Sequence, residues 1–177
     1  MNYYFSYGSN NLEQIKDKLN NDNIKAYKAY LNDYYLTFGG SSTKWGGAVA
    51  SILYSKDNSL TYGTVYEITD RELRILDAYE GTNTDNPTSE NQKINLYRRT
   101  KIQVNISFEN DVFEEKECYV YIKNSTKFYS LPSDKYINAC INNLSQFWED
   151  KTEILWETVN EIKDLAYEIK QMKHILI

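Results

Sequence analysis

Histidine is nearly absent from this sequence, and its absence removes whole classes of catalytic site. The only histidine is His174, close to the end of the 177 residues. Serine or cysteine triads that rely on an internal imidazole are therefore nearly excluded, as are metal sites built from several histidines. Carboxylates, hydroxyls, backbone amides and lysine are left to carry any chemistry, and no cofactor is implied.

Cysteine is also scarce, and long apolar runs are missing. Cys118 and Cys140 lie in unrelated segments, and the N-terminus does not combine a basic region, an apolar core and a small-residue cleavage site. We therefore expect a reducing, cytoplasmic location. No apolar run approaches the ~18 to 20 residues that cross a bilayer, so a membrane span is not expected.

The charges show no excess that would indicate a nucleic-acid partner. Twenty basic and 25 acidic side chains give a net charge of -5, and the lysines are scattered rather than gathered in a stripe. The length is ordinary for one domain, which at this size buries roughly two-thirds of its unfolded surface. We predict a single domain over 1–177, present as a monomer or a homodimer.

The spacing of apolar and turn-forming residues predicts an α+β fold. A strand at 2–7 ends in Gly8-Ser9-Asn10, a cluster suited to a turn and a helix cap before a short helix. The other expected elements are strands near 34–38, 48–54 and 62–68, a helix after a capping box at Thr69, a hairpin of 97–108 with 117–123, and helices opening at Pro132-Ser133 and at Thr152.

The order of these elements favours one architecture. Consecutive strands in the middle and the longest helices at the end indicate a mixed, curled or barrel-like β-sheet, with short helices and two C-terminal helices, the last at about 152–173 packed on it. Residues 83–95 are polar and without periodicity, which predicts a long surface loop that could act as a lid.

Three segments, in a fixed order, carry the residues that matter most for function. They are Tyr7-Gly8-Ser9-Asn10, Gly46-Gly47-Ala48 and Glu80-Gly81. Together they resemble the gamma-glutamylcyclotransferase and AIG2-like family over about residues 3–136. The resemblance implies an active site made of the YGSN loop and the acidic residue of the EG pair, which releases a gamma-glutamyl group as 5-oxoproline.

The first loop has a physical reason to bind an anion. A loop that leads into a helix N-terminus presents free backbone N–H groups, so Gly8, Ser9 and Asn10 can hold a substrate carboxylate or a developing oxyanion. Glycine also permits close approach of the backbone. The alternative is that Gly8-Ser9-Asn10 is only a turn and a helix cap.

Glu80 fits the chemistry that the resemblance implies. A gamma-glutamyl group carries its own nucleophile, an α-amine that closes a five-membered ring on the γ-carbonyl, so the enzyme needs neither a covalent intermediate nor a histidine. A single carboxylate can take the proton from the α-ammonium and return one to the leaving amine. The alternative is that Glu80 is an exposed residue at a helix end.

Other residues are given supporting or structural interpretations. Tyr97 and Tyr136 stand where the family places rings that border the substrate, although in a chain with 17 tyrosines either could serve packing. Trp45-Gly46-Gly47 is interpreted as structural, with glycines that let the chain pass close to the first loop. Lys16 and Lys18 are interpreted as the solvated face of the first helix.

We therefore expect a gamma-glutamylcyclotransferase of glutathione metabolism, classed with the transferases or lyases. Its substrate is a small gamma-glutamyl amino acid or gamma-glutamylamine, Glu80 is the general acid and base, and Tyr7, Gly8, Ser9, Asn10, Tyr97 and Tyr136 bind the substrate. One alternative is a non-catalytic binding or interaction protein that keeps the fold. Another is cyclotransfer on glutathione itself, against which Asn10 counts, because relatives specialised for it carry a different loop after YGS.

Overall fold

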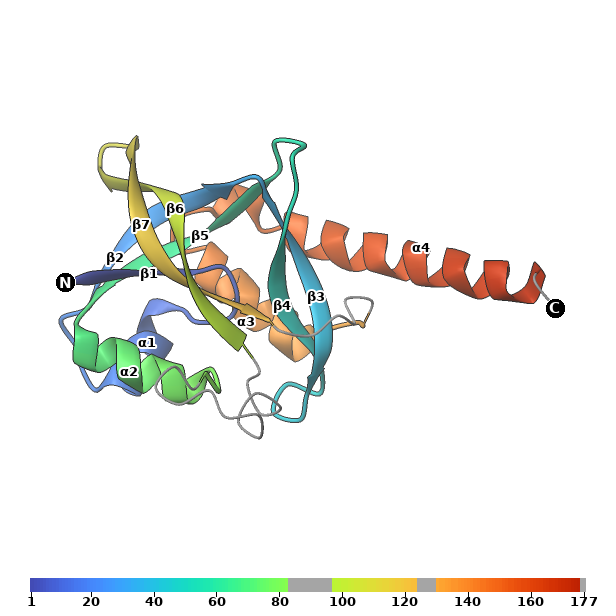
Figure 1. The fold of residues 1–177 in the computed structure, drawn as a ribbon, viewed down its shortest axis with the longest axis horizontal. Coiled ribbons are helices and arrows are strands. Elements are labelled where there is room, and N and C mark those ends of the chain that lie inside the picture. Colours follow the sequence, from blue (N-terminus) through green and yellow to red (C-terminus); the bar gives the residue numbers. More distant parts are fainter. Residues whose placement is uncertain (83–96, 124–129, 176–177) are drawn as a thin grey trace.

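The computed structural model describes residues 1–82, 97–123 and 130–175 and confirms the α+β fold with a barrel-like mixed sheet (Figure 1). Five strands close a barrel in the order β1-β5-β2-β6-β7, and two further strands pair as a separate antiparallel sheet. The strands are β1 Asn2–Ser6, β2 Lys25–Asn32, β3 Tyr34–Ser42, β4 Gly47–Tyr54, β5 Leu60–Ile68, β6 Tyr97–Glu109 and β7 Val112–Lys123. The helices are α1 Leu12–Leu19, α2 Asp70–Tyr79, α3 Asp134–Leu144, the short 3-10 turn η2 Glu149–Lys151, and α4 Ile154–Ile175.

Strand β2 is the element that the sequence did not predict. It lies between β5 and β6 in the barrel and pairs antiparallel with both. Its sequence, KAYKAYLN, is rich in lysine and alanine, which are depleted in strands. Burial of Ala29 and Leu31 in the barrel and pairing on both edges stabilise it in spite of that composition.

The pairing of β1 with β5 explains how Glu80 comes near the first loop. Asn2 pairs with Ile68, so β5 ends beside the start of β1. Helix α2 then runs back along β1, and its ten residues span about 15 Å, close to the roughly 17 Å of the five-residue strand. The end of α2 therefore lies level with the loop that follows β1.

Helix α2 begins at the predicted capping box, which the structure confirms. The hydroxyl of Thr69 accepts a hydrogen bond from the backbone N–H of Glu72 at 3.3 Å, and the Glu72 carboxylate accepts one from the backbone N–H of Thr69 at 2.7 Å. Leu73 and Leu76 are buried on the inner face, against Tyr4, Tyr66 and neighbouring apolar side chains. The cap and this apolar face fix where the helix starts and which side it presents to the barrel.

Strand β7 brings a lysine to the same end of the barrel. β7 runs parallel to β1 with Tyr119 opposite Tyr4, so four residues further along each strand Lys123 lies level with Gly8. β6 pairs antiparallel with β7 and sets Tyr97 opposite Lys123. Parallel and antiparallel register together gather these residues around the loop after β1.

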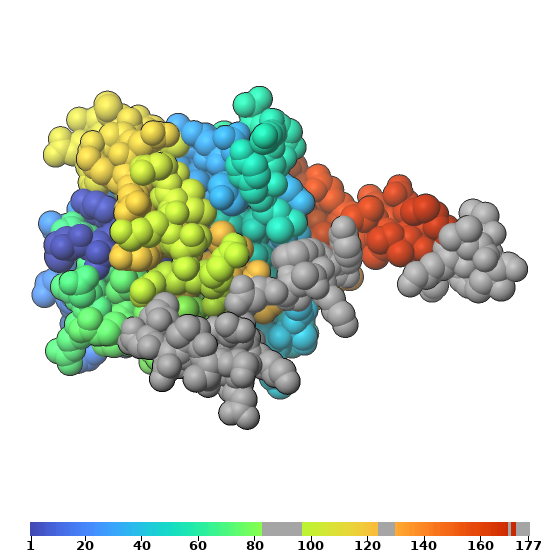
Figure 2. All heavy atoms as spheres, in the orientation of Figure 1, coloured from blue at the N-terminus to red at the C-terminus, as the bar shows by residue number. Residues whose placement is uncertain are grey.

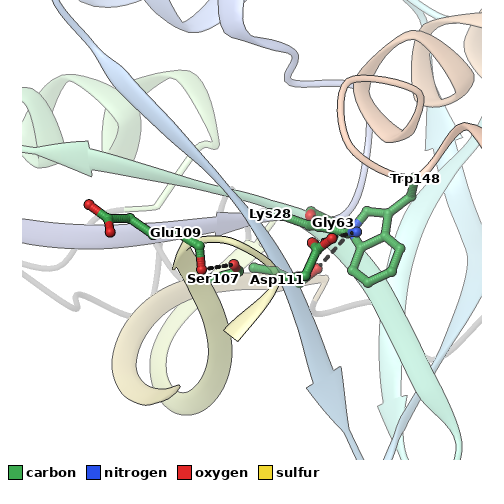
Figure 3. Close-up of polar contacts among 7 residues, drawn as sticks. Lys28, Gly63, Ser107, Glu109, Asp111 and Trp148 are labelled. Atoms are coloured by element: carbon green, nitrogen blue, oxygen red, sulfur yellow. Dashed lines mark hydrogen bonds and ion pairs between the residues drawn. The ribbon is translucent and has the colours of Figure 1, made fainter. Parts of the chain in front are cut away.

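The indole of Trp148, which follows α3, lies against strands β2 and β5 (Figure 3). Its Nε1 donates hydrogen bonds to the carbonyls of Ala29 and Gly63 at 3.1 and 3.2 Å. The Lys28 ammonium lies 4.4 Å from the indole ring centre and donates to Asp111 at 2.8 Å. This cluster is structural, because the indole N–H is fully used by two barrel strands.

Helix α4 packs on the body only through its first turns. Leu155, Val159 and Ile162 are buried in the main core, whereas the rest of the helix stands clear of the body (Figures 1 and 2). Across the described ranges, no helix is both long enough and apolar enough to cross a membrane. The single-domain organisation remains a prediction.

Candidate functional site

A cavity of about 630 Å³ opens where the loop after β1, the end of α2 and the end of β7 meet. Its wall includes all seven residues that the sequence singled out: Tyr7, Gly8, Ser9, Asn10, Glu80, Tyr97 and Tyr136. The end of β3 and the turn that follows it, residues 41–45, form another part of the wall. The predicted residues, which are spread over 130 positions of sequence, are thus gathered in one hollow.

The helix cap lies one residue later than the sequence indicated. The side chain of Asn11, not one of Gly8-Ser9-Asn10, caps α1 by accepting a hydrogen bond from the backbone N–H of Gln14 at 2.9 Å. The predicted cap within that cluster is therefore wrong. Because Asn11 does the capping, the side chain of Asn10 is released toward the cavity.

The backbone N–H groups of the loop after β1 are available to a ligand. Within the described chain, the N–H groups of Gly8, Ser9 and Asn10 donate no hydrogen bond. Their carbonyls are held instead: Asn143 Nδ2 donates to Gly8 O at 2.8 Å, and the Tyr66 hydroxyl donates to Asn10 O at 2.9 Å. A loop fixed through its carbonyls with its amides free can bind an anion.

Asn143 is a residue that the sequence analysis missed. It is buried in α3, and besides Gly8 its Nδ2 contacts the Ser6 carbonyl at 3.3 Å, while its Oδ1 lies 3.2 Å from the Tyr66 hydroxyl and accepts a hydrogen bond from Gln146 Nε2 at 2.9 Å. One sequence signal could have identified it: Asn143 is a polar residue within the apolar stripe of α3 that includes Tyr136, Ile137 and Cys140.

Asn10 joins the loop to the carboxylate of Glu80. Asn10 Nδ2 donates to Glu80 Oε1 at 3.0 Å and to the Tyr4 hydroxyl at 2.8 Å, and its Oδ1 accepts a hydrogen bond from Lys18 Nζ at 2.6 Å. Glu80 is partly buried, and the predicted alternative of an exposed helix-end residue does not describe it. The amide of Asn10 is fixed in one orientation, because the lysine can only donate and the carboxylate can only accept.

Lys18 was interpreted as part of the solvated face of α1, and that interpretation is wrong. It lies four residues after Gln14, on the same helix face, and both side chains line the cavity. Burial lowers the pKa of the Lys18 ammonium, and the nearby charge of Glu80 acts in the opposite direction. The local sequence concealed this role, because lysine near a helix end usually points to solvent.

Tyr97 and Tyr136 are anchored on the backbone of a single residue of β4, Ala50. The hydroxyl of Tyr136 accepts a hydrogen bond from Ala50 N at 2.9 Å, and the hydroxyl of Tyr97 donates one to Ala50 O at 3.2 Å. Burial raises the pKa of both phenols, so both remain protonated. Their rings form the wall of the cavity, while their hydroxyls serve the structure.

Two glycines have different neighbours around the cavity. A Cβ at Gly8 would lie 3.3 Å from the Tyr136 hydroxyl. Because glycine has no side chain, the loop has room to pass beside the Tyr136 ring. A Cβ at Gly47 would lie 2.8 Å from Leu131 O and 3.0 Å from Ser133 N. Gly47 therefore permits close contact with the segment before α3 and not with the first loop, as had been expected, while Trp45 lines the cavity.

A buried ion pair holds α2, the helix that ends at Glu80, on the barrel. Asp77, one turn before Glu80, forms an ion pair with Arg99 and accepts a hydrogen bond from the Tyr121 hydroxyl at 2.9 Å. The backbone carbonyl of Tyr121 in turn accepts a hydrogen bond from the hydroxyl of Tyr7. Helix α2, strand β7 and the first loop are connected through these side chains. The predicted loop at 83–95 lies outside the described residues.

Comparisons with known proteins agree on the family and the fold. The family described as Gamma-glutamyl cyclotransferase, AIG2-like, matches residues 4–138. No curated protein matches the chain by sequence. Three solved structures share its fold, each at less than 25% sequence identity.

The first two structures match nearly end to end. A structure named Gamma-glutamyl cyclotransferase is 23% identical with a TM-score of 0.69, and the match covers 94% of this chain and 98% of that one. The uncharacterized protein loc79017 from Homo sapiens is 24% identical with a TM-score of 0.70, over 92% and 96% of the two chains.

YkqA from Bacillus subtilis is 19% identical with a TM-score of 0.67, and the match covers 90% of this chain but only 54% of that longer one. The structures support the fold, and the family match spans well over half of the sequence. The chain belongs to the gamma-glutamyl cyclotransferase, AIG2-like family.

Proposed function

We propose that this protein is a gamma-glutamyl cyclotransferase that converts a gamma-glutamyl compound into 5-oxoproline and a free amine or amino acid. The observation that carries the proposal is the hydrogen bond from Asn10 to Glu80 inside the cavity. It sets a carboxylate beside a loop whose backbone amides are available for an anion. The family match supports the same class of reaction.

The substrate is oriented by its α-carboxylate. We assign this group to the backbone N–H groups of Gly8, Ser9 and Asn10, which donate no hydrogen bond within the described residues. Backbone amides in a rigid loop bind a carboxylate without any rearrangement of side chains. The neighbouring α-ammonium is then directed toward the carboxylate of Glu80.

Glu80 acts first as a base and then as an acid. Its carboxylate takes a proton from the α-ammonium, and the freed amine attacks the γ-carbonyl carbon to close a five-membered ring. Glu80 passes its proton to the leaving nitrogen as the bond between that carbon and that nitrogen breaks, and the restored carboxylate takes the second proton from the ring nitrogen and transfers it to the released amine. No covalent bond to the protein forms, because the substrate carries its own nucleophile.

Asn10 keeps Glu80 in place for both steps. One carboxylate oxygen, Oε1, accepts the hydrogen bond from Asn10 Nδ2. Among the described residues no hydrogen bond engages the other oxygen, Oε2, which we assign to proton transfer. The rings of Tyr7, Tyr97 and Tyr136 border the substrate and exclude water from it.

A reducing, cytoplasmic setting and a link to glutathione metabolism belong to the same proposal. Both cysteines are buried free thiols, which is compatible with a reducing compartment. The protein is proposed to act as a monomer or a homodimer, and its molecular mass in solution distinguishes the two.

The test is product analysis on a panel of gamma-glutamyl amino acids and gamma-glutamylamines. The protein is incubated with each compound, and 5-oxoproline and the released amine are quantified by mass spectrometry. We expect both products in equal amounts from at least one class. Tight binding without any product would support instead the non-catalytic alternative, a binding protein that keeps the fold.

A further inference from the structure

A buried lysine in the cavity wall has no partner for its charge among the residues that the structure describes. Lys123, at the end of β7, is only 8% exposed. Within the described residues its ammonium forms neither a hydrogen bond nor an ion pair, and its one close neighbour is the ring of Tyr97, 5.0 Å away. A buried ammonium is costly unless an anion or a set of acceptors compensates for the lost water.

The surroundings of the Lys123 ammonium differ from those of the other two lysines that line the cavity, Lys18 and Lys44. Lys18 donates its hydrogen bond to Asn10 and is therefore occupied. Lys44 is exposed, so water can solvate it. Lys123 alone of these three is both buried and without an acceptor in the described chain, and it lies in the field of Glu80, the one carboxylate that borders this cavity among the described residues.

Lys123 lies on the β3 side of the cavity. Its side chain lies over Gly40 of β3, where an added Cβ would come within 2.3 Å of the lysine Cε and 3.2 Å of Nζ. Glu80 enters the same cavity from the end of α2, a different element. The lysine therefore adds a second anion-binding point, on an element that carries neither Glu80 nor the loop amides.

This inference rests on the proposed function and narrows its substrate class. With the α-carboxylate of the glutamyl group on the loop amides, the remaining position for an anion is on the leaving amine. We propose that Lys123 is a specificity-determining residue that binds a carboxylate on the leaving amine, so that the preferred substrates are gamma-glutamyl compounds whose leaving group is an amino acid rather than a neutral amine.

A matched pair of substrates isolates that carboxylate. Gamma-glutamylalanine and gamma-glutamylethylamide differ only by the carboxylate on the leaving group, and release of 5-oxoproline from each gives a value of kcat/KM. An ammonium-to-carboxylate hydrogen bond predicts that the wild-type protein favours the alanine compound by about tenfold or more. Lys123→Met should bring the ratio of the two kcat/KM values to within about threefold of one.

Lys44→Met is the matched control, because it removes the same charge from an exposed position at the same cavity. It should leave the ratio close to that of the wild type, since an exposed charge is solvated and screened. Lys123→Gln provides a second variant if Lys123→Met does not fold, with circular dichroism as the check on folding.

Each remaining outcome overturns the inference in a recognisable way. A wild-type protein that makes 5-oxoproline equally well from both compounds has no such carboxylate site. Equal losses on both compounds in Lys123→Met would assign the lysine to the glutamyl part or to the fold. Absence of 5-oxoproline from every gamma-glutamyl compound would instead reject the proposed function, and this inference with it.

Discussion

Asn10 and Glu80 are 70 positions apart in sequence, and Asn10 Nδ2 lies 3.0 Å from Glu80 Oε1. The contact exists because α2 runs back along β1 for a matching length, and because Asn11 takes over the capping of α1. It joins two of the three motifs that the family resemblance rests on.

Lys18→Met should lower kcat by about tenfold, because the lysine fixes the amide of Asn10 through a charge-assisted hydrogen bond. Since Lys18 acts through Asn10 and not on the substrate, KM and the melting temperature should change little. Lys16→Met, two residues earlier in the same helix, is the control and should behave as the wild type. Steady-state kinetics on a gamma-glutamyl substrate separate the two variants, and full kcat in Lys18→Met would remove the lysine from the site.

Gly8→Val and Gly47→Ala should have opposite consequences. A Cβ at Gly8 lies 3.3 Å from the hydroxyl of Tyr136, a side-chain atom that must give by a few tenths of an ångström, in a loop that borders the cavity. We expect KM to rise with a small loss of stability. At Gly47 a Cβ meets the backbone of Leu131 and Ser133, so Gly47→Ala should cost about 1–3 kcal/mol in unfolding free energy.

Thermal melting and KM measurements on the two glycine variants, each made separately, provide the comparison. A Gly8→Val protein that melts as early as Gly47→Ala and keeps a normal KM would show that the first loop is only a turn. That result would favour the structural alternative for Gly8-Ser9-Asn10.

Asp77→Asn should destabilise the protein by about 3–5 kcal/mol, because it leaves the partly buried guanidinium of Arg99 without its counter-ion. Urea unfolding followed by tryptophan fluorescence measures the change. Asp70→Asn, an exposed change at the start of the same helix, is the control and should stay within about 0.5 kcal/mol of the wild type. Similar losses in both variants would contradict a specific role for the ion pair in holding α2.

The two thiols should be inert in the folded protein. Burial raises the pKa of both Cys118 and Cys140 to about 12, from an ordinary value of 9.0. Between pH 9.0 and about 12 the thiols are ionised in the unfolded chain but still protonated in the folded protein. The free energy of unfolding therefore falls as the pH rises through this range, and it is unaffected by these groups below pH 9.0. At pH 8, iodoacetamide should label neither thiol until denaturant is added, and mass spectrometry detects the difference. Rapid labelling of the native protein would contradict the buried placement.

The sequence was most informative where local chemistry and chain order agreed. The capping box at Thr69 is local, because its partners lie three residues apart, and the structure confirms it. The order of the YGSN and EG motifs indicated the family and its α+β fold. Hydrophobic spacing found the strands in which apolar and aromatic residues predominate.

The features that were missed depend on contacts between distant segments. Strand β2 carries lysines and alanines that have little strand propensity of their own, and the pairing with β5 and β6 decides its structure. Lys18 and Lys123 look like ordinary surface lysines until the parallel register of β1 with β7 and the packing of α1 turn them toward the cavity. Asn143 supports a loop 135 residues earlier, at Gly8, a relation that no local pattern contains.

Release of 5-oxoproline by Glu80→Gln tests the central claim most directly. The amide has nearly the same shape as the carboxylate and cannot take the proton, so turnover should fall by about 10² to 10⁴ while binding of the substrate and the melting temperature are retained. Binding is followed by calorimetry and product by mass spectrometry, on the compound that the wild-type protein turns over fastest. A Glu80→Gln protein that releases 5-oxoproline at the wild-type rate would contradict the account.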